Sequence, residues 1–146
     1  MSAETVRDAM VPEPTTLGAE ATAQEAGRCF ADNGEVRAIF VTEDGGQLLG
    51  VVTRKTLVRE VVAAGLEPRA VTLREIAEPP NFTLDAGLGL EGAFRFLEEE
   101  DLERVPVVEE GGRLVGVLSR AVVQRRLAED EPPEGAPEPE PGSVVL

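Results

Sequence analysis

The sequence predicts an α/β fold made of two tandem copies of one unit, packed face to face with pseudo-two-fold symmetry. An internal repeat supports this prediction. Residues 39–54 read IFVTEDGGQLLGVVTR, residues 105–120 read VPVVEEGGRLVGVLSR, and eight of the sixteen positions are identical. Upstream, VRD at 6–8 corresponds to LRE at 73–75. Because a unit of about 60 residues buries too little apolar surface to be stable alone, we expect both copies to form one body.

Each copy is expected to begin with a short helix, an extended stretch and an amphipathic helix. The short helices fall at 5–10 and 73–77, the extended stretches at 15–17 and 82–84, and the amphipathic helices at 22–32 and 88–101. Apolar residues spaced i, i+3, i+4 and i+7 predict the inner face of each amphipathic helix. The paired positions of this face are Ala23 and Leu90, Ala26 and Ala93, Gly27 and Phe94, and Phe30 and Leu97.

A β-hairpin and a further helix complete each copy. Strands at 37–42 and 48–52 flank Glu-Asp-Gly-Gly, and strands at 104–108 and 114–118 flank Glu-Glu-Gly-Gly. Such glycine pairs are typical of tight hairpin turns. Thr53 and Ser119 then stand where a helix N-cap belongs. The helix after Thr53 is expected to end at Gly65. Its apolar positions are expected to point inward: Leu57, Val58, Val61 and Val62.

These elements divide the chain into a first repeat at 1–65, a link at 66–72, a second repeat at 73–128 and a tail at 129–146. The tail is rich in proline, and its first fourteen residues include six acidic and no basic ones. Such a composition lacks the apolar groups that offset the entropy of ordering. We therefore expect an extended segment that contacts a protein partner, rather than part of the core.

Composition excludes several classes of function. The net charge is −14, which repels phosphate backbones and argues against a nucleic-acid partner. The chain has no histidine and one cysteine, Cys29, so histidine-based catalysis, histidine metal ligands and an intrachain disulfide are excluded. No apolar run approaches the ~20 residues of a membrane span, and no signal peptide is recognisable. We expect a cytoplasmic, non-enzymatic protein without a metal or cofactor.

In order and content these elements resemble the CBS domain family, named after cystathionine β-synthase. The resemblance rests on VRDAMVP at 6–12, RVPVV at 104–108, the two glycine hairpins, and GVVTR at 50–54 repeated as GVLSR at 116–120. It covers about residues 5–127. It implies a tandem pair, or Bateman module, that often forms homodimers. It also implies an adenine nucleotide or related adenosyl ligand between the repeats, and regulation of a partner.

The resemblance also implies which residues contact such a ligand. In the family, the threonine or serine at the helix N-terminus meets the phosphate, where unpaired N–H groups favour an anion. The arginine that follows suits a pair of phosphate oxygens. These positions hold Thr53 and Arg54 in the first repeat, and Ser119 and Arg120 in the second. The family's ribose-binding aspartate is replaced by Thr56, which keeps a hydroxyl, and by Val122, which does not.

Further contacts are implied from the opening stretches and the adjacent strands. They are Met10, Val11, Thr15, Thr16, Arg37, Ala38, Pro80, Phe82 and Val105. Two interpretations stay open. In the first, the chain is a regulatory module that binds AMP, ADP, ATP or a similar adenosine-containing ligand and modulates a partner. In the second, it is a ligand-free module for dimerisation or protein docking, with Thr53 and Ser119 as plain N-caps. The replaced aspartates favour the second interpretation.

Overall fold

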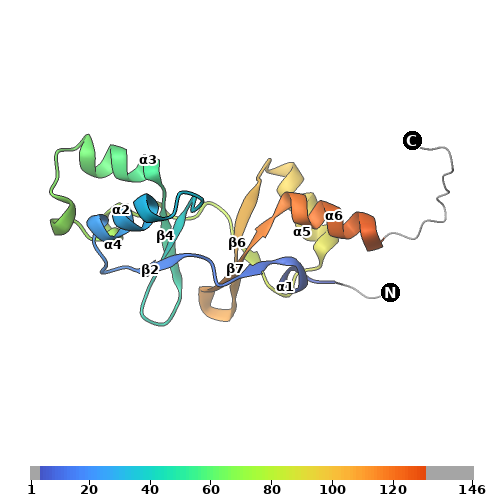
Figure 1. Cartoon of the computed structure of the whole chain (residues 1–146). Coiled ribbons are helices and arrows are strands. Elements are labelled where there is room, and N and C mark those ends of the chain that lie inside the picture. The colour runs from blue at the N-terminus through green and yellow to red at the C-terminus, as the bar shows by residue number, and fades with distance from the viewer. Residues whose placement is uncertain (1–3, 131–146) are drawn as a thin grey trace, which may run out of the picture.

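The computed structural model describes residues 4–130. The acidic tail predicted at 129–146 lies outside the described residues except for its first two positions, which end the last helix. Two mixed α/β halves lie side by side, with their sheets toward the middle of the molecule and their helices toward the two ends (Figure 1). The predicted fold class is confirmed.

The elements of the two repeats follow the same order. The first repeat contains α1 (Val6–Ala9), β1 (Val11–Pro12), β2 (Thr16–Gly18), α2 (Ala23–Asp32), β3 (Ile39–Thr42), β4 (Leu48–Val52), α3 (Arg54–Leu57) and the π-helix η1 (Val58–Val62). The link carries the 3-10 helix η2 (Pro68–Ala70). The second repeat contains α4 (Leu73–Ile76), β5 (Leu84–Asp85), α5 (Leu90–Glu99), β6 (Arg104–Glu109), the 3-10 helix η3 (Glu110–Gly112), β7 (Arg113–Ser119) and α6 (Arg120–Asp130).

Each half is built on a mixed sheet. In the first, β2 pairs parallel to β3, and β3 pairs antiparallel to β4. The second repeats this arrangement with β5, β6 and β7, and β1 is added at its edge beside β7. The hairpin turns use glycine as predicted, since Gly46 has φ +90° and Gly111 has φ +79°, a left-handed conformation that glycine adopts without strain.

The opening helices are exchanged between the halves. The backbone N–H of Val6 in α1 donates to the carbonyl of Leu88 (2.8 Å), and α1 packs into the core of the second repeat. Reciprocally, the N–H of Leu73 in α4 donates to the carbonyl of Ala21 (2.8 Å), and α4 packs into the core of the first. The sequence repeats and the packed halves are therefore not the same units, and the exchange holds the halves together.

The segments that follow these helices lie across the opposite sheet. Val51 and Glu78 exchange two backbone hydrogen bonds (2.8 and 2.9 Å), and Val11 pairs with Val117 at the equivalent place. The approach is close because β4 carries a glycine there. A β-carbon on Gly50 would lie 2.7 Å from the carbonyl oxygen of Glu78. The crossing segments thus give the fold its pseudo-two-fold symmetry.

The helix after Thr53 differs from its prediction in the direction of its side chains. Val61 is buried and Leu57 partly buried, whereas Val58 is 57% and Val62 is 70% exposed. The expectation that all four point inward is wrong, because their stripe spans about 140° of a helix whose inner side alone meets the core. Gly65, with φ +72°, ends the helix as predicted.

Candidate functional site

A cleft of about 230 Å³ opens between the repeats. β4 supplies one wall, and the crossing segment after α4 and the start of β6 supply the others. Three of the predicted ligand contacts line it: Pro80, Phe82 and Val105. The other lining residues were not among the predicted contacts: Val51, Glu78, Pro79, Asn81, Leu102, Arg104 and Pro106. The structure thus brings together three of the contacts predicted in the second repeat, whereas Ser119 and Arg120 do not line this cleft.

The interior of this cleft is largely apolar. Val105 is buried beneath it, and Phe82 is half-buried. The ring of Phe82 is held edge-on against Phe96, with centroids 5.3 Å apart and an interplanar angle of 76°. An aromatic ring fixed in this way gives a flat wall at little entropic cost. Such a surface suits a planar apolar group, such as a heterocyclic ring.

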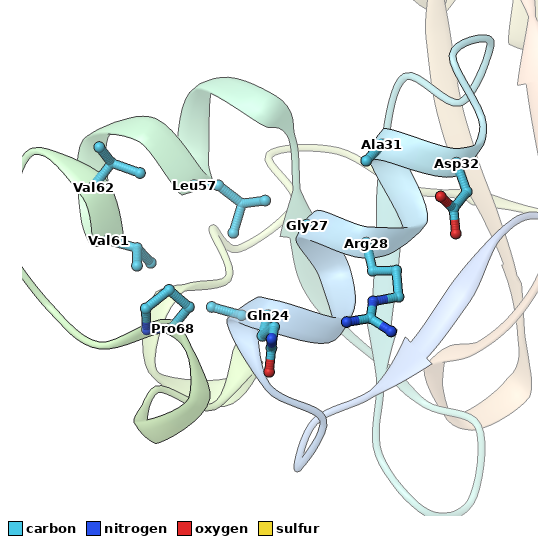
Figure 2. A pocket seen from close by; sticks show the side chains of 10 residues that line it. Gln24, Gly27, Arg28, Ala31, Asp32, Leu57, Val61, Val62 and Pro68 are labelled. Atoms are coloured by element: carbon cyan, nitrogen blue, oxygen red, sulfur yellow. The ribbon is translucent and has the colours of Figure 1, made fainter.

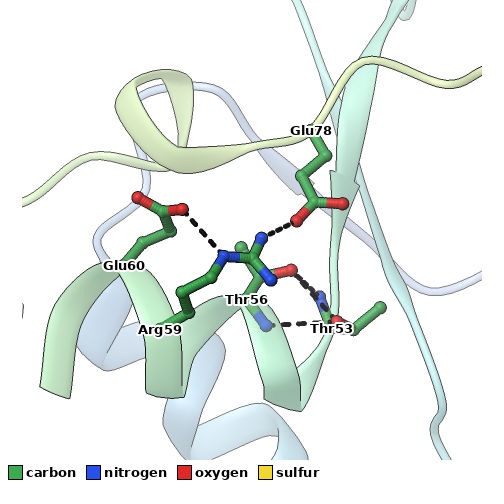
Figure 3. A network of polar contacts seen from close by, with 5 residues as sticks. All are labelled: Thr53, Thr56, Arg59, Glu60 and Glu78. Carbon is green, nitrogen blue, oxygen red and sulfur yellow. Dashed lines mark hydrogen bonds and ion pairs between the residues drawn. The ribbon is translucent and has the colours of Figure 1, made fainter. Parts of the chain in front are cut away.

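Two charged residues line the cleft. Arg104 begins β6, directly opposite Ser119 in the β6–β7 pairing, and it is exposed. It makes no ion pair within residues 4–130. The carboxylate of Glu78 bonds to Arg59 of η1, and Arg59 also bonds to Glu60 at 3.0 Å (Figure 3). The pKa of Arg59 is raised by these hydrogen bonds, first to Glu60 and then to Glu78. Arg104 is therefore the lining cation that stays available.

The two predicted N-caps are present. The N–H of Thr56 donates to Thr53 Oγ1 (3.2 Å), and the N–H of Thr53 donates to Thr56 Oγ1 (3.1 Å), which forms a capping box (Figure 3). Thr56 is only 1% exposed, so its hydroxyl is directed into the fold and not to the surface. The N–H of Val122 donates to Ser119 Oγ at 3.4 Å. Ser119 and Thr53 thus stabilise helix ends, and a ligand contact by either stays a prediction.

The two predicted phosphate-binding arginines contact the protein itself. Arg54 donates to the carbonyl of Phe30 (3.1 Å) at the end of α2, and its guanidinium lies 4.7 Å from the centroid of the same residue's ring. At the equivalent end of α5, Arg120 donates to the carbonyl of Leu97 (3.4 Å) and to Glu103 (2.8 Å). Cations stabilise helix C-termini because carbonyls there lack partners. Both arginines therefore have a structural role, which the sequence analysis missed.

The remaining predicted contacts come from the first repeat, from its opening stretch and from the residues before β3. Met10 and Val11 lie where the first crossing segment meets β7, Thr15 and Thr16 lie at the start of β2, and Arg37 and Ala38 precede β3. Met10 packs so closely on β7 that a β-carbon on Gly116 would lie 2.6 Å from its sulfur. Met10 and Val11 thus contact β7, Thr15 and Thr16 lie beside β3, and the part of all six residues in binding stays a prediction.

Two equivalent ion pairs fasten each opening helix to the hairpin of the other sequence repeat. Arg74 bonds both carboxylate oxygens of Glu43 (2.8 and 3.0 Å), and Arg7 bonds Glu109. The hydrogen bond from Arg74 lowers the pKa of Glu43, and the hydrogen bond from Arg7 lowers the pKa of Glu109. The repeated arginines and glutamates of the sequence thus connect the two repeats.

Residues 4–130 contain neither a cluster of metal-ligand side chains nor a membrane-spanning helix. Histidine, cysteine, aspartate and glutamate side chains do not gather there in groups of three or more that could hold a metal ion. None of the helices in that range is both long and apolar enough to cross a membrane.

Comparison with known proteins agrees with the fold. The sequence model of the CBS domain matches residues 6–63 and again residues 73–129. Hypoxic response protein 1 of Mycobacterium tuberculosis is 31% identical over 125 residues, which are 86% of each chain. A crystal structure of Hypoxic Response Protein I with two coordinated zinc ions has a TM-score of 0.71 at 30% identity, and it covers 84% of this chain and 98% of its own.

A second similar structure is the cytosolic domain of the Mg2+ channel MgtE in complex with ATP, which has a TM-score of 0.64 at 26% identity. The similarity covers 80% of this chain and 46% of the MgtE chain. The repeat, the exchanged opening helices and these matches lead to one conclusion. The chain belongs to the CBS domain family, and it contains a tandem pair of these domains.

Proposed function

We propose that this CBS pair is a non-catalytic regulatory module that binds an adenosine-containing ligand, such as AMP, ADP or ATP, in the cleft between its repeats. The observation that carries the proposal is the combination of an apolar slot at Phe82 and Val105 with the available cation of Arg104. The MgtE cytosolic domain, a similar CBS structure, was solved with ATP. The ligand acts as a regulator here and not as a cofactor.

The dimensions of the cleft suggest how such a ligand would lie. Its volume of about 230 Å³ is below the ~300 Å³ at which pockets for drug-sized ligands begin. A nucleoside would fill it, and the phosphates would extend toward the rim. Arg104 and Ser119, which face each other across β6 and β7, would meet them there. In this arrangement Arg104 takes the part that the sequence analysis gave to Arg120.

Regulation would begin at the ion pair between Glu78 and Arg59. Glu78 lines the cleft, whereas Arg59 belongs to η1, and its side chain reaches across to Glu78 (Figure 3). A ligand phosphate beside Glu78 would repel its carboxylate and attract Arg59, and would thereby change the contact that positions η1. A ligand shifts such an equilibrium only by its different affinity for the two arrangements. We place the module in the cytoplasm as a homodimer that acts on a protein partner.

The ligand-free module for dimerisation or docking is the second candidate. The structural roles of Arg54, Arg120 and the buried Thr56 favour it, because three of the predicted ligand contacts are engaged within the fold. In this case the acidic segment at 129–146 would contact the partner. The two candidates differ in one observable, which is whether an adenosine-containing compound stabilises the folded protein.

Thermal unfolding with AMP, ADP, ATP, NAD and S-adenosylmethionine separates them. A ligand at 100 times its dissociation constant adds ~2.7 kcal/mol, or roughly 5–15 °C in a domain of this size. We expect Arg104→Gln to weaken the apparent affinity for phosphorylated ligands at least ~10-fold, because a charge-assisted hydrogen bond is lost. The thermal shift that these ligands cause should be smaller as a result. The control, Arg95→Gln on the exposed side of α5, should behave as wild type. No shift with any compound would favour the ligand-free module, and an unaffected Arg104→Gln would place the ligand elsewhere.

A further inference from the structure

The pseudo-two-fold symmetry of the fold gives the cleft a counterpart. The cleft lies between β4, the crossing segment after α4 and the start of β6. The symmetry-related elements are β7, the crossing segment after α1 and the start of β3. We call the region that they border, at residues 11–15, 38–40 and 117, the counterpart region. A tandem pair thus has two equivalent places for a ligand, and the side chains at each place decide whether it is open.

Phe40 stands in the counterpart region, at the position equivalent to the cleft-lining Pro106. In the pairing of β3 with β4 it lies directly opposite Val51, which also lines the cleft. Side chains directly opposite each other project from the same face of a sheet, so the ring of Phe40 lies on the face toward the other half. Phe40 is only 8% exposed, yet it belongs to neither of the two apolar cores of the described chain. A large ring that is buried outside both cores fills space between the halves.

The counterpart region lacks the cation of the cleft. Ala38 occupies the position equivalent to Arg104, and its methyl group offers no hydrogen bond to a phosphate. The neighbouring Arg37 is equivalent to Glu103, which is not among the residues that line the cleft. Because a phosphate gives up part of its hydration on binding, a place without a cation offers it little compensation.

Two further exchanges act in the same direction. Thr15 stands where Phe82 forms the aromatic wall, so the flat surface for a heterocyclic ring is missing. Glu13 stands where Pro80 lines the cleft, and its exposed carboxylate repels a phosphate. The filled interior, the missing cation and the added carboxylate all disfavour a nucleotide at the counterpart region.

The first repeat has a larger hollow, but its lining does not suit a nucleotide. This hollow has a volume of about 470 Å³ and lies between α2 and the helix formed by α3 and η1 (Figure 2). Leu57, Val61 and Pro68 line it, and none of the described residues around it is aromatic. Its charged side chains, Arg28 and Asp32, have opposite signs, so it offers a phosphate no net positive charge. Of the two hollows, only the cleft combines an aromatic wall with an available cation.

We infer that each chain takes one adenosine-containing ligand, in the cleft at Phe82 and Arg104, and that Phe40 closes the counterpart region with a side chain of the protein itself. The single ligand rests on the proposed function, whereas the closure by Phe40 does not depend on it. The six contacts that the resemblance implies in the first repeat then touch no ligand. The two halves share a fold, but only one of them senses a nucleotide.

Thermal unfolding of the full chain without ligand tests whether the counterpart region is filled. Phe40→Ala removes a buried ring and should lower the unfolding midpoint by roughly 10–20 °C. Pro106→Ala is the matched control at the open cleft and should lower the midpoint by no more than about 5 °C. If Phe40→Ala does not fold, Phe40→Leu should show a smaller loss in the same direction. Small and equal losses at the two positions would show that Phe40 is not packed between the halves, and would overturn the inference.

Isothermal titration calorimetry of the full chain with ADP then counts the ligands. We expect one equivalent per chain, which Arg104→Gln weakens at least ~10-fold. Phe40→Ala combined with Ala38→Arg should open the counterpart region and bind a second equivalent. The control combines Ala38→Arg with Val41→Ala, which opens a cavity within the core instead, and should still bind one. Two equivalents in the wild type would overturn the inference and leave the proposed ligand in place. No binding of ADP, together with a large loss of stability in Phe40→Ala, would refute the proposed ligand and leave the closure by Phe40 standing.

Discussion

The exchange of the opening segments between the two halves depends on Gly50 and Gly116, where these segments cross β4 and β7. Replacing Gly50 tests this exchange directly. Gly50 lies where the segment after α4 crosses β4, and a β-carbon there would be 2.7 Å from the carbonyl oxygen of Glu78 and 3.0 Å from Ala77 Cβ. Real β-carbons essentially never approach another heavy atom within 3.0 Å. Gly50→Ala must therefore displace backbone, because the obstructing oxygen belongs to the main chain and has no rotamer to change.

The size of the effect follows from three contributions. Overpacking of a fitted contact costs about 1–3 kcal/mol. The displacement also weakens the two backbone hydrogen bonds between Val51 and Glu78, each worth about 1 kcal/mol. Replacing glycine by alanine restores about 0.4–1 kcal/mol by restricting the unfolded chain. We expect a net loss of about 1–3 kcal/mol, which lowers the unfolding midpoint by roughly 4–12 °C for a domain of this size.

Differential scanning calorimetry of Gly50→Ala and of a control, Gly34→Ala, measures this loss. A β-carbon on Gly34 would meet no heavy atom within 4 Å, so its alanine variant should be neutral or slightly stabilised. Because Val51 and Glu78 also line the cleft, Gly50→Ala should in addition weaken any nucleotide-induced stabilisation. Equal midpoints for Gly50→Ala and wild type would refute the close crossing of β4, and the exchange would need another explanation.

Two further predictions concern the arginines. Arg54→Ala should lower the stability of the ligand-free protein by about 1–3 kcal/mol in urea unfolding, because α2 loses its C-terminal cap and the ring contact with Phe30. An unchanged free energy of unfolding would argue against this structural role and would favour the predicted contact of Arg54 with a ligand phosphate. Since Arg74 lowers the pKa of Glu43 in the folded state, their pair stabilises the protein above the ~4.3 of an unfolded glutamate, and this contribution is lost as pH falls through the lowered pKa. Arg74→Gln should therefore destabilise the protein near neutral pH and progressively less in acid; a constant difference would contradict this linkage.

Short-range sequence patterns predicted most of the elements because short-range interactions determine them. β4 spans Leu48–Val52 as expected, since the glycine pair before it specifies the turn and Thr53 after it begins a helix. α2 begins one residue after Thr22, its predicted first residue, because the Thr22 side chain caps it. Phe82, by contrast, lies before β5 and not within a strand, and this position lets it form a wall of the cleft.

The long-range packing of the helices could not be predicted from local sequence patterns in the same way. α1 and α4 have similar sequences, and either could pack on either sheet without changing a local pattern. The structure assigns α1 to the second core through Val6 and α4 to the first core through Leu73. The resemblance to the family predicted that Arg54 and Arg120 bind a ligand. Their contacts with the ends of α2 and α5 could not be predicted from sequence, because these contacts depend on the tertiary fold. Arg104 carried a usable signal, its place beside Val105 at the start of the β6 strand, and was not selected.

The two repeats differ at equivalent positions, and one ion pair links the cleft to η1. Phe82 gives the second repeat an aromatic wall of the cleft where the first has Thr15, and Phe94 packs against the core where the first has Gly27. Glu78 borders the cleft, and its partner Arg59 lies within η1 between Val58 and Val62. On the proposed function, a ligand that alters this ion pair also alters the position of η1. Such coupling is reciprocal, so a partner that binds η1 must then change nucleotide affinity by the same factor as nucleotide changes the affinity for that partner.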